Sequence, residues 1–247
     1  MSPPLSGNLG GIWVYLAASP LLGLTLTLLA YQGAVLISKA CKGHPLANPV
    51  LLAIAALVAL LSATGTPYRT YFDGAQFVHF LLGPATVALA IPLYAQLKRL
   101  RVMAMPLLAA LLAGSLTAGL SAVLIGHALG ASDATLLSLA PKSVTTPIAM
   151  GIAERIGGLP SLTAVLVILT GILGAVGASG LYALLKIDDH AVRGFAIGVA
   201  SHGIGTARAF HISEQMGAFA ALAMGLNGLL TAVLLPWLVP PLVRWLG

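Results

Sequence analysis

The chain has 247 residues, of which 59% are hydrophobic and only 7% charged, and its mean hydropathy is +1.01. A soluble domain carries about a quarter charged residues, so the composition excludes an ordinary soluble domain and predicts one all-α polytopic membrane domain over residues 1–247. The net charge of +6 comes mostly from cations in short gaps between apolar runs, without a basic aromatic face, which argues against nucleic acid binding.

Catalytic and metal-binding patterns are absent from the sequence. Cys41 is the single cysteine, and no Cys/His cluster has metal-ligand spacing. All six acidic residues lie at or near the ends of apolar runs, and neither a Gly-x-Ser-x-Gly nor a His-Glu-x-x-His motif occurs. We therefore expect no metal, no cofactor and no enzymatic activity.

Four apolar runs in the first half can cross a bilayer, which takes about 20 residues. They are residues 12–38, the shorter 49–63, 74–97 and 102–132. The third run contains Gly83 and Pro84, and because proline lacks a backbone donor and clashes one turn back, a kink or break is predicted there. Lys98, Arg99 and Arg101 follow it and are predicted to be cytoplasmic, whereas the first 38 residues lack Lys and Arg, so the N-terminus is expected on the other side.

The second half alternates polar and apolar segments. Residues 134–156 and 195–210 are the polar ones, and each is followed by an uncharged run, residues 156–185 and 215–243. The total is seven or eight membrane segments, depending on whether residues 141–150 complete a crossing. Glycines at 171, 174, 177 and 180 lie three apart, which we interpret as close packing against a neighbouring helix.

An internal repeat is also predicted. Residues 109–125 match residues 219–235 at an offset of 110, and Gly83-Pro84-Ala85-Thr86 and Gly203-Ile204-Gly205-Thr206 precede the two copies. Two halves, about 10–130 and 131–247, would each hold an interrupted helix and a long intact one, which is the pattern of a transporter with its site between repeats. The sequence leaves open whether the repeats are inverted or parallel.

The polar stretches have the chemistry of a small-anion site. Pro141 and Pro147 bracket one helix break, and Gly203 and Gly205 give a second stretch the freedom to unwind. The ends of broken helices leave backbone groups unpaired, and an N-terminal end attracts an anion. The expected ligand-binding residues are Lys142, Ser143, Thr145, Thr146, Ser201, His202, Gly203, Gly205, Thr206, Arg208 and Asn227.

Each of these residues also has a structural interpretation. The alternative for Lys142 is an interfacial lysine that reaches the headgroups, and the alternative for Arg208 is a cytoplasmic cation at a helix end. His202 could be a core histidine, and Asn227 could hydrogen-bond a neighbouring helix. With no carboxylate at membrane depth, coupling to H⁺ would require His202, and coupling to Na⁺ would require hydroxyls and carbonyls.

Several motifs resemble the LrgB/CidB (YohK-type) membrane proteins. They are KSVTTPIA at 142–149, GLPSLTA at 158–164, SHGIGTAR at 201–208, MGLNG at 224–228 and, more loosely, FVHFLLGPATVALAIPLY at 77–94. The resemblance implies discontinuous helices like those of bile-acid-type transporters and a multi-pass protein of the bacterial inner membrane. It also implies an LrgA/CidA-like partner membrane protein as a separate chain, and the small-residue faces permit a homodimer.

The resemblance implies two functions. Plastid relatives carry glycolate and glycerate and some bacterial pairs are linked to pyruvate uptake, whereas other members are named as antiholin-like or holin-like modulators of murein hydrolase export and autolysis. A wide, non-selective lesion does not need cations and hydroxyls at two matched helix breaks. We therefore favour a secondary transporter of small monocarboxylates over an antiholin-like regulator, with a purely structural scaffold as a third alternative.

Overall fold

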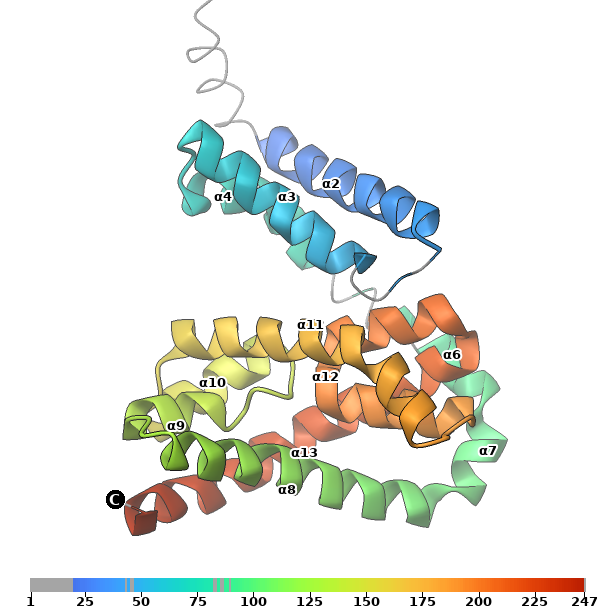
Figure 1. Ribbon diagram of the computed structural model, residues 1–247, viewed down its shortest axis with the longest axis vertical. Coiled ribbons are helices and arrows are strands. Elements are labelled where there is room, and N and C mark those ends of the chain that lie inside the picture. The colour runs from blue at the N-terminus through green and yellow to red at the C-terminus, as the bar shows by residue number, and fades with distance from the viewer. Residues whose placement is uncertain are drawn as a thin grey trace, which may run out of the picture. The chain divides into compact units, whose positions relative to one another are not determined.

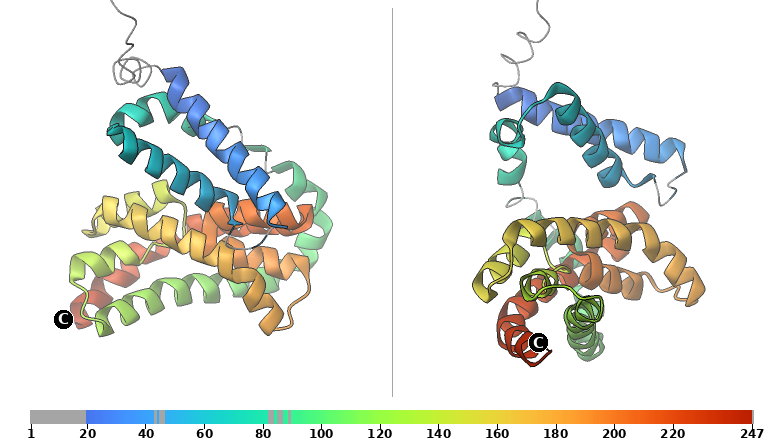
Figure 2. Two further views of the ribbon diagram at one scale, coloured as in Figure 1. Left: turned by 45° about the horizontal axis from the view of Figure 1, so that its top comes forward. Right: turned by 60° about the vertical axis from the view of Figure 1, so that its left-hand side comes forward.

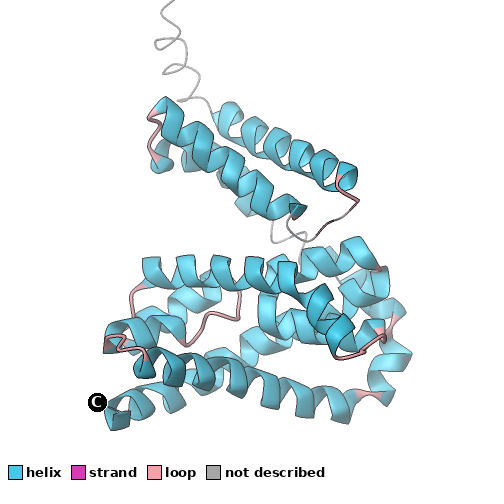
Figure 3. Ribbon diagram, in the orientation of Figure 1, coloured by secondary structure: helices cyan, strands magenta, loops and turns pink. Residues whose placement is uncertain are grey.

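The computed structural model describes residues 20–42, 44, 47–81, 84, 87–88 and 90–246, and these form α-helices joined by short loops (Figures 1 and 3). The helices are α2 (Pro20–Ala40), α3 (Pro49–Thr64), α4 (Tyr68–Phe80), α6 (Ala90–Ala95), α7 (Leu97–Val102), α8 (Ala104–Ala128), α9 (Asp133–Leu139), α10 (Thr146–Ile156), α11 (Pro160–Leu184), α12 (His190–Ile212) and α13 (Glu214–Leu246). Helices α2, α8, α11 and α13 are long and apolar enough to cross a membrane, and α3 is a shorter apolar helix. The chain is therefore a helical membrane protein.

The chain divides into two compact units, residues 1–88 and 89–247. In the first unit α2 packs on both α3 and α4. A Cβ at Gly23 would lie 2.7 Å from the carbonyl oxygen of Tyr71, so glycine allows the backbones of α2 and α4 to approach closely. Asn48 caps α3 by accepting hydrogen bonds from the amides of Val50 and Leu51 at 2.9 and 3.2 Å. Of the predicted break at Gly83 and Pro84, Gly83 lies outside the described residues.

Three long helices frame the second unit. Helices α8 and α13 run in the same direction, because Ser115 meets Thr231 and Gly119 meets Leu235 (Figures 1 and 2). Helix α11 runs the opposite way: it begins beside α9, which follows the end of α8, and the loop after it is bound to Arg99, just before α8. The unit therefore has one end near Arg99 and another near Asp133.

Helix α12 is two antiparallel arms, residues 190–200 and 203–212. Ser201 (φ −128°, ψ 16°) and His202 (φ 41°, ψ −134°) have non-helical dihedrals and reverse the chain. As a result the hydroxyl of Ser213 lies 3.1 Å from Nδ1 of His190, 23 residues earlier. An unbroken helix would separate these residues by about 34 Å. Helix α12 is therefore a hairpin whose tip is Ser201–His202.

Helices α9 and α10, with residues 140–145 between them, form a second hairpin. The Leu159 amide, just after α10, donates to the hydroxyl of Ser138 at the end of α9 at 2.7 Å, and the Thr163 hydroxyl donates to the Ser138 carbonyl at 3.1 Å. A Cβ at Gly158 would lie 2.9 Å from the Ser138 amide nitrogen, so glycine lets the two ends of this hairpin touch. The chain between them extends to a tip at residues 140–145.

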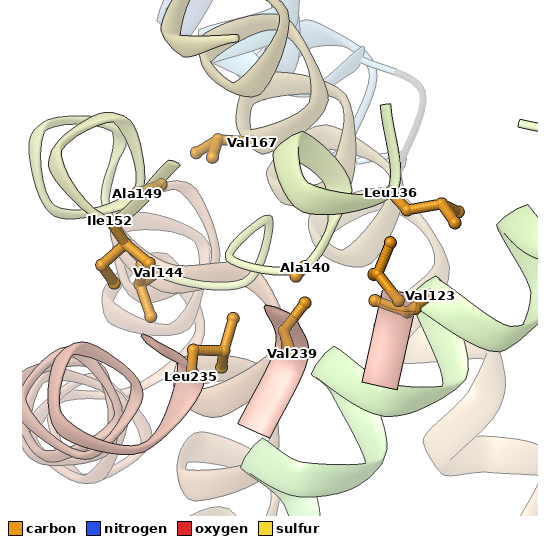
Figure 4. Close-up of a cluster of buried hydrophobic side chains, with 10 residues drawn as sticks. Val123, Leu136, Ala140, Val144, Ala149, Ile152, Val167, Leu235 and Val239 are labelled. Atoms are coloured by element: carbon orange, nitrogen blue, oxygen red, sulfur yellow. The ribbon is translucent and has the colours of Figure 1, made fainter. Parts of the chain in front are cut away.

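Close packing holds the hairpins against the long helices. Gly194 and Gly198, spaced by four on the first arm of α12, let that arm lie directly on the backbone of α13 at Met216 and Ala220. Around the α9–α10 hairpin, buried apolar side chains from α8, from the hairpin itself, from α11 and from α13 point toward one another (Figure 4). They are Val123, Leu136, Ala140, Val144, Ala149, Ile152, Val167, Leu235, Val239 and Val243. In lipid such contacts stabilise through dispersion and fit, since the tails are themselves apolar.

Candidate functional site at two hairpin tips

The first tip is a non-helical segment that contains Lys142. Two turns shape it, one closed by the Lys142 amide on the Leu139 carbonyl and one by the Val144 amide on the Pro141 carbonyl, both at 3.2 Å. Thr145 then takes an extended conformation (φ −64°, ψ 147°) as the N-cap of α10, with Pro147 in the first turn. The predicted break between Pro141 and Pro147 is therefore present.

The second tip lies one to two residues earlier than predicted. The sequence suggested that Gly203 and Gly205 unwind, but both are helical, and the break falls on Ser201 and His202. His202 takes a positive φ of 41°, which costs energy in a residue with a Cβ and needs support from its surroundings. The role of Gly205 is close packing, since a Cβ there would lie 2.7 Å from the Ser201 Cβ and 2.8 Å from the Ile197 carbonyl oxygen.

Asn227, in the middle of α13, joins the two tips. Its side-chain nitrogen donates to the Ser143 carbonyl at 3.3 Å and to the Val199 carbonyl at 3.1 Å. A helical carbonyl normally accepts from the amide four residues on, so the break after Val199 leaves its carbonyl needing another donor. Asn227 is 1% exposed and donates both of its amide hydrogens to these two carbonyls. Its side chain therefore holds the two tips beside each other.

Each tip held at this junction carries polar side chains and is followed by a helix N-terminus. The Lys142 ammonium donates to the Ser143 hydroxyl at 3.3 Å, and the Lys142 side chain is half-buried. Helix α10 begins at Thr146 without a side-chain cap, and the second arm of α12 begins at residue 203. Unpaired amides in the first turn of a helix attract anions, and a lysine adds a full positive charge. The junction therefore has the electrostatics of a carboxylate site.

The second tip is anchored on α11. Nε2 of His202 lies 2.9 Å from the Val167 carbonyl, and because a carbonyl only accepts, this nitrogen is the donor. A Cβ at Gly171 would lie 2.8 Å from the His202 ring, and one at Gly174 would collide with the Ser201 hydroxyl. The predicted packing role of the glycine series thus holds for its first two members, which face the tip. Gly177 and Gly180 have no such neighbour within 4 Å, because a spacing of three drifts around a helix.

The Ser201 hydroxyl is the unsatisfied polar group of this region. Ser201 is 1% exposed, and its Oγ has no hydrogen-bond partner among the described residues. Buried hydroxyls in proteins nearly always have a partner, and one without a partner marks a place for a ligand, an ion or a water molecule. Thr206 differs, because its hydroxyl donates to the His202 carbonyl at 2.8 Å.

The base of the α12 hairpin is fixed by charged groups. Asp189 caps α12 by accepting from the amides of Ala191 and Val192 at 2.7 and 3.1 Å, and it forms a 2.6 Å ion pair with Arg99. The Val192 amide, with that of Ala191 and the Arg99 guanidinium, holds the pKa of the Asp189 carboxyl below its usual value. Arg193 pairs with Asp188 at 2.8 Å and also donates to the Ile187 carbonyl. These contacts place α7, the loop at 185–189 and the start of α12 at one end of the unit.

The comparison with known families decides the identity. A family model described as the LrgB-like family matches residues 27–240. The chain belongs to the LrgB-like family. Both tips, Asn227, α8 and α11 lie inside the matched range, which ends within α13. No solved structure matches this LrgB-like chain.

Curated relatives cover nearly the whole LrgB-like chain. It is 38% identical over 221 residues to the uncharacterized protein YwbG of Bacillus subtilis, covering 89% of this chain and 97% of that protein. It is 31% identical over 223 residues to a protein named antiholin-like protein LrgB in Bacillus cereus, covering 90% and 96% respectively. A protein of the same name in Bacillus anthracis matches to the same extent.

The predicted site residues of the LrgB-like chain fall into three groups. Lys142, Ser143 and Thr145, with Ser201 and His202, form the tips themselves. Thr146, Gly203, Gly205 and Thr206 lie in the first turn of the helix after each tip. Arg208 lies further along the second arm, about 9 Å from His202 along a helix axis.

Other contributors were not predicted from the sequence. Val167 acts through its backbone carbonyl, which no side-chain pattern reveals. Gly194 and Gly198 carry a small-xxx-small spacing that the sequence does show, and this spacing identifies the face of α12 that lies on α13.

Proposed function

We propose that this protein is a secondary transporter of small monocarboxylates that works by alternating access. The observation that supports this is the junction at Asn227, where one side chain binds both tips, the first of which holds Lys142 four residues before the N-terminus of α10. Substrate contacts are assigned to Lys142, Ser143, Thr145, Thr146, Ser201, Gly203 and Thr206, with Arg208 as a further cation on the same arm. Cationic and hydroxyl donors at broken helices suit a carboxylate that carries a hydroxyl or keto oxygen.

The finer fold and location follow from the same proposal. Seven or eight membrane segments, counting the discontinuous ones whether or not they cross, in a bile-acid-transporter-like arrangement of two repeats, would hold the site near mid-membrane. The location is the inner membrane of a bacterial cell, and the coupling ion is H⁺ or Na⁺. An LrgA/CidA-like membrane protein and a second copy of the chain are the proposed partners.

The second candidate is an antiholin-like regulator of murein hydrolase export and autolysis. The name of the Bacillus cereus relative, antiholin-like protein LrgB, favours this function. A regulator acting only through protein contacts does not require a lysine and a helix N-terminus at the first tip, or an unsatisfied buried hydroxyl at the second. The two candidates therefore differ in whether small carboxylates bind at the tips.

Uptake by the purified protein separates the candidates. Labelled glycolate, glycerate, pyruvate and lactate are offered to proteoliposomes that hold the protein alone, under a pH gradient or a Na⁺ gradient. Saturable uptake is expected for at least one substrate, with a loss of tenfold or more in Lys142→Ala and Arg208→Ala, because each removes a charged donor. Lys98→Ala, an exposed lysine on α7, is the matched control and retains uptake. Folded protein that transports none of these, with or without an LrgA-like partner, would support the antiholin-like function.

A further inference from the structure

The two hairpins point into the second unit from its opposite ends. The α9–α10 hairpin starts at Asp133, just after α8, and finishes at Ile156, just before α11, and contacts of Leu136 with Gly126 of α8 and of Ser138 with Leu159 keep it between these two helix ends. The α12 hairpin starts and finishes between the end of α11 and the start of α13, where His190 meets Ser213. Since α11 runs from the first of these ends to the second, the hairpins have opposite orientations.

The sequence contains a repeat that matches this arrangement at an offset of 60, from residue 140 onward. Each copy contains a break, a short helical arm and a long helix, so residues 140–184 correspond to 200–244. Identical pairs include Ala140 and Ala200, Thr146 and Thr206, Ala149 and Ala209, Ile152 and Ile212, Glu154 and Glu214, Gly157 and Gly217, Leu162 and Leu222, Leu166 and Leu226, and Leu169 and Leu229. Alanine and leucine match easily, but the threonine, glutamate and glycine pairs fall at corresponding points of the two copies.

The contacts of the two tips follow the same repeat. The first tip is bound at Asn227 of α13, and the second tip is bound at Val167 of α11, which is the equivalent position 60 residues earlier. Lys142 of the first tip is likewise equivalent to His202 of the second. Each long helix thus holds the tip of the other copy's hairpin at the same point along its length. Accidental similarity between apolar helices does not account for these paired contacts.

We propose that α9–α10 and α12 are inverted re-entrant hairpins, and that Asn227 is the positioning residue that keeps their tips together. Asn227 is a support rather than a substrate ligand, because both of its amide hydrogens are used. His202 supports the second tip in the same way through Val167. Each hairpin enters from one side of the membrane and returns to it, so neither crosses. This goes beyond carboxylate transport, since the orientation of the hairpins holds whatever the cargo.

Charge assigns the sides. Among the described residues of the second unit, Lys98, Arg99, Arg101, Lys186 and Arg193 lie near the base of α12 with Asp188, Asp189 and Glu214, whereas only Arg155 and Arg244 lie toward the other end, with Asp133 and Glu154. Cytoplasmic loops carry the excess of Lys and Arg. The α12 hairpin therefore enters from the cytoplasm and the α9–α10 hairpin from outside.

Sided labelling tests the orientation without any substrate. Single cysteines are placed at the exposed positions Ser132, Leu159, Leu185 and Glu214 in a Cys41→Ser background, and spheroplasts are treated with a membrane-impermeant maleimide before and after permeabilisation. Ser132→Cys and Leu159→Cys should label from outside, and Leu185→Cys and Glu214→Cys only after permeabilisation. Labelling of Ser132→Cys and Leu159→Cys from opposite sides would show that residues 133–158 cross the membrane and would overturn the proposal.

A second experiment tests the role of Asn227. The alkylation rate of Thr145→Cys reports on the first tip, because Thr145 is half-buried and lies two residues after Ser143. Asn227→Ala, and the isosteric Asn227→Asp where Ala does not fold, should raise this rate several-fold by releasing the tip. Thr231→Val is the matched control: it removes the 3.4 Å bond to Asn227 Oδ1 and the 3.2 Å bond to the Ser115 hydroxyl but leaves both carbonyl bonds intact, so the rate should not change. Equal rates in the Asn227 variants and the parent would contradict a positioning role.

Discussion

At the scale of single residues, the tips depend on glycines, which lack a Cβ, as much as on polar groups. Gly171 and Gly174 leave room for the His202 ring and the Ser201 hydroxyl against α11. Both serine and histidine are costly in a membrane interior unless their polar groups are satisfied or used. His202 is satisfied by the Val167 carbonyl, whereas the Ser201 hydroxyl, packed against Gly174, has no hydrogen-bond partner among the described residues.

The glycine series offers a matched pair of substitutions. In Gly174→Ala the new Cβ collides with the Ser201 hydroxyl, so unfolding free energy should fall by about 1–3 kcal/mol, as in other overpacked sites. Gly177→Ala meets nothing within 4 Å and should be neutral or slightly stabilising, since alanine favours a helix. Melting temperatures in detergent measure both.

A rescue variant makes this prediction specific. Adding Ser201→Gly to Gly174→Ala removes the hydroxyl that the new methyl group strikes, so most of the lost stability should return. A double variant no more stable than Gly174→Ala alone would show that the damage arises elsewhere on α11.

The polar residues of both tips could be predicted from their types, because cations, hydroxyls and prolines are rare in apolar runs. Lys142 and His202 were identified this way, and both lie at a chain reversal. The break at Ser201–His202 instead of Gly203 could not be predicted, since it depends on which positions α11 accommodates. The partner of His202 is a backbone carbonyl, and every residue type offers one.

At the scale of elements, the α12 hairpin depends on how its base is tied. Asp189 caps the first arm and pairs with Arg99, and Ser213 of the second arm meets His190. These contacts join both ends of the hairpin to the segment before α8. They leave the tip to be set by Asn227 and Val167.

Removing the cap should loosen α12. Asp189→Ala should lower the unfolding free energy by about 1 kcal/mol, the usual contribution of an N-cap, whereas Asp189→Asn keeps the cap acceptor and should lose less. The exposed ion pair with Arg99 adds little. Melting temperatures of the three proteins in detergent at pH 7 test this order.

The same comparison has a pH dependence of known sign. The folded-state pKa of Asp189 lies below its unfolded value, so its stabilisation is present above the unfolded value of about 3.9 and is lost as pH falls through the lower folded-state pKa. The difference in melting temperature between the parent and Asp189→Ala should therefore shrink on acidification below about pH 4. A difference that stays constant down to pH 3 would contradict the assignment of this carboxylate as the cap.

Hydrophobic patterning predicted the long helices α8, α11 and α13 but not the paths between them. Residues 134–156 and 195–210 were read as membrane segments, and their reversal at a mid-segment break is visible only in contacts such as Ser138 with Leu159. Short arms have the same composition whether they cross or return. The 110-residue repeat stays a prediction, whereas the 60-residue offset is supported by matching contacts.

At the scale of the whole molecule, the proposed transport depends on two tips of opposite orientation at one junction. A site between inverted hairpins can be opened from either side by moving one hairpin at a time, which is the requirement of alternating access. The conformation described here has the second tip buried, with His202 4% exposed, while Lys142 and Thr145 of the first tip are half-buried. The first tip is therefore the side on which substrate should enter from this state.

The most direct measurement is substrate protection of a tip cysteine. Thr145→Cys in a Cys41→Ser background is alkylated in proteoliposomes with and without glycolate, glycerate, pyruvate or lactate, with chloride as the control anion. If carboxylates bind at the hairpin tips, a transported carboxylate should slow alkylation at the concentrations that saturate uptake, and Lys142→Ala should remove this protection. An alkylation rate that no carboxylate changes, in folded and active protein, would contradict a binding site at the hairpin tips.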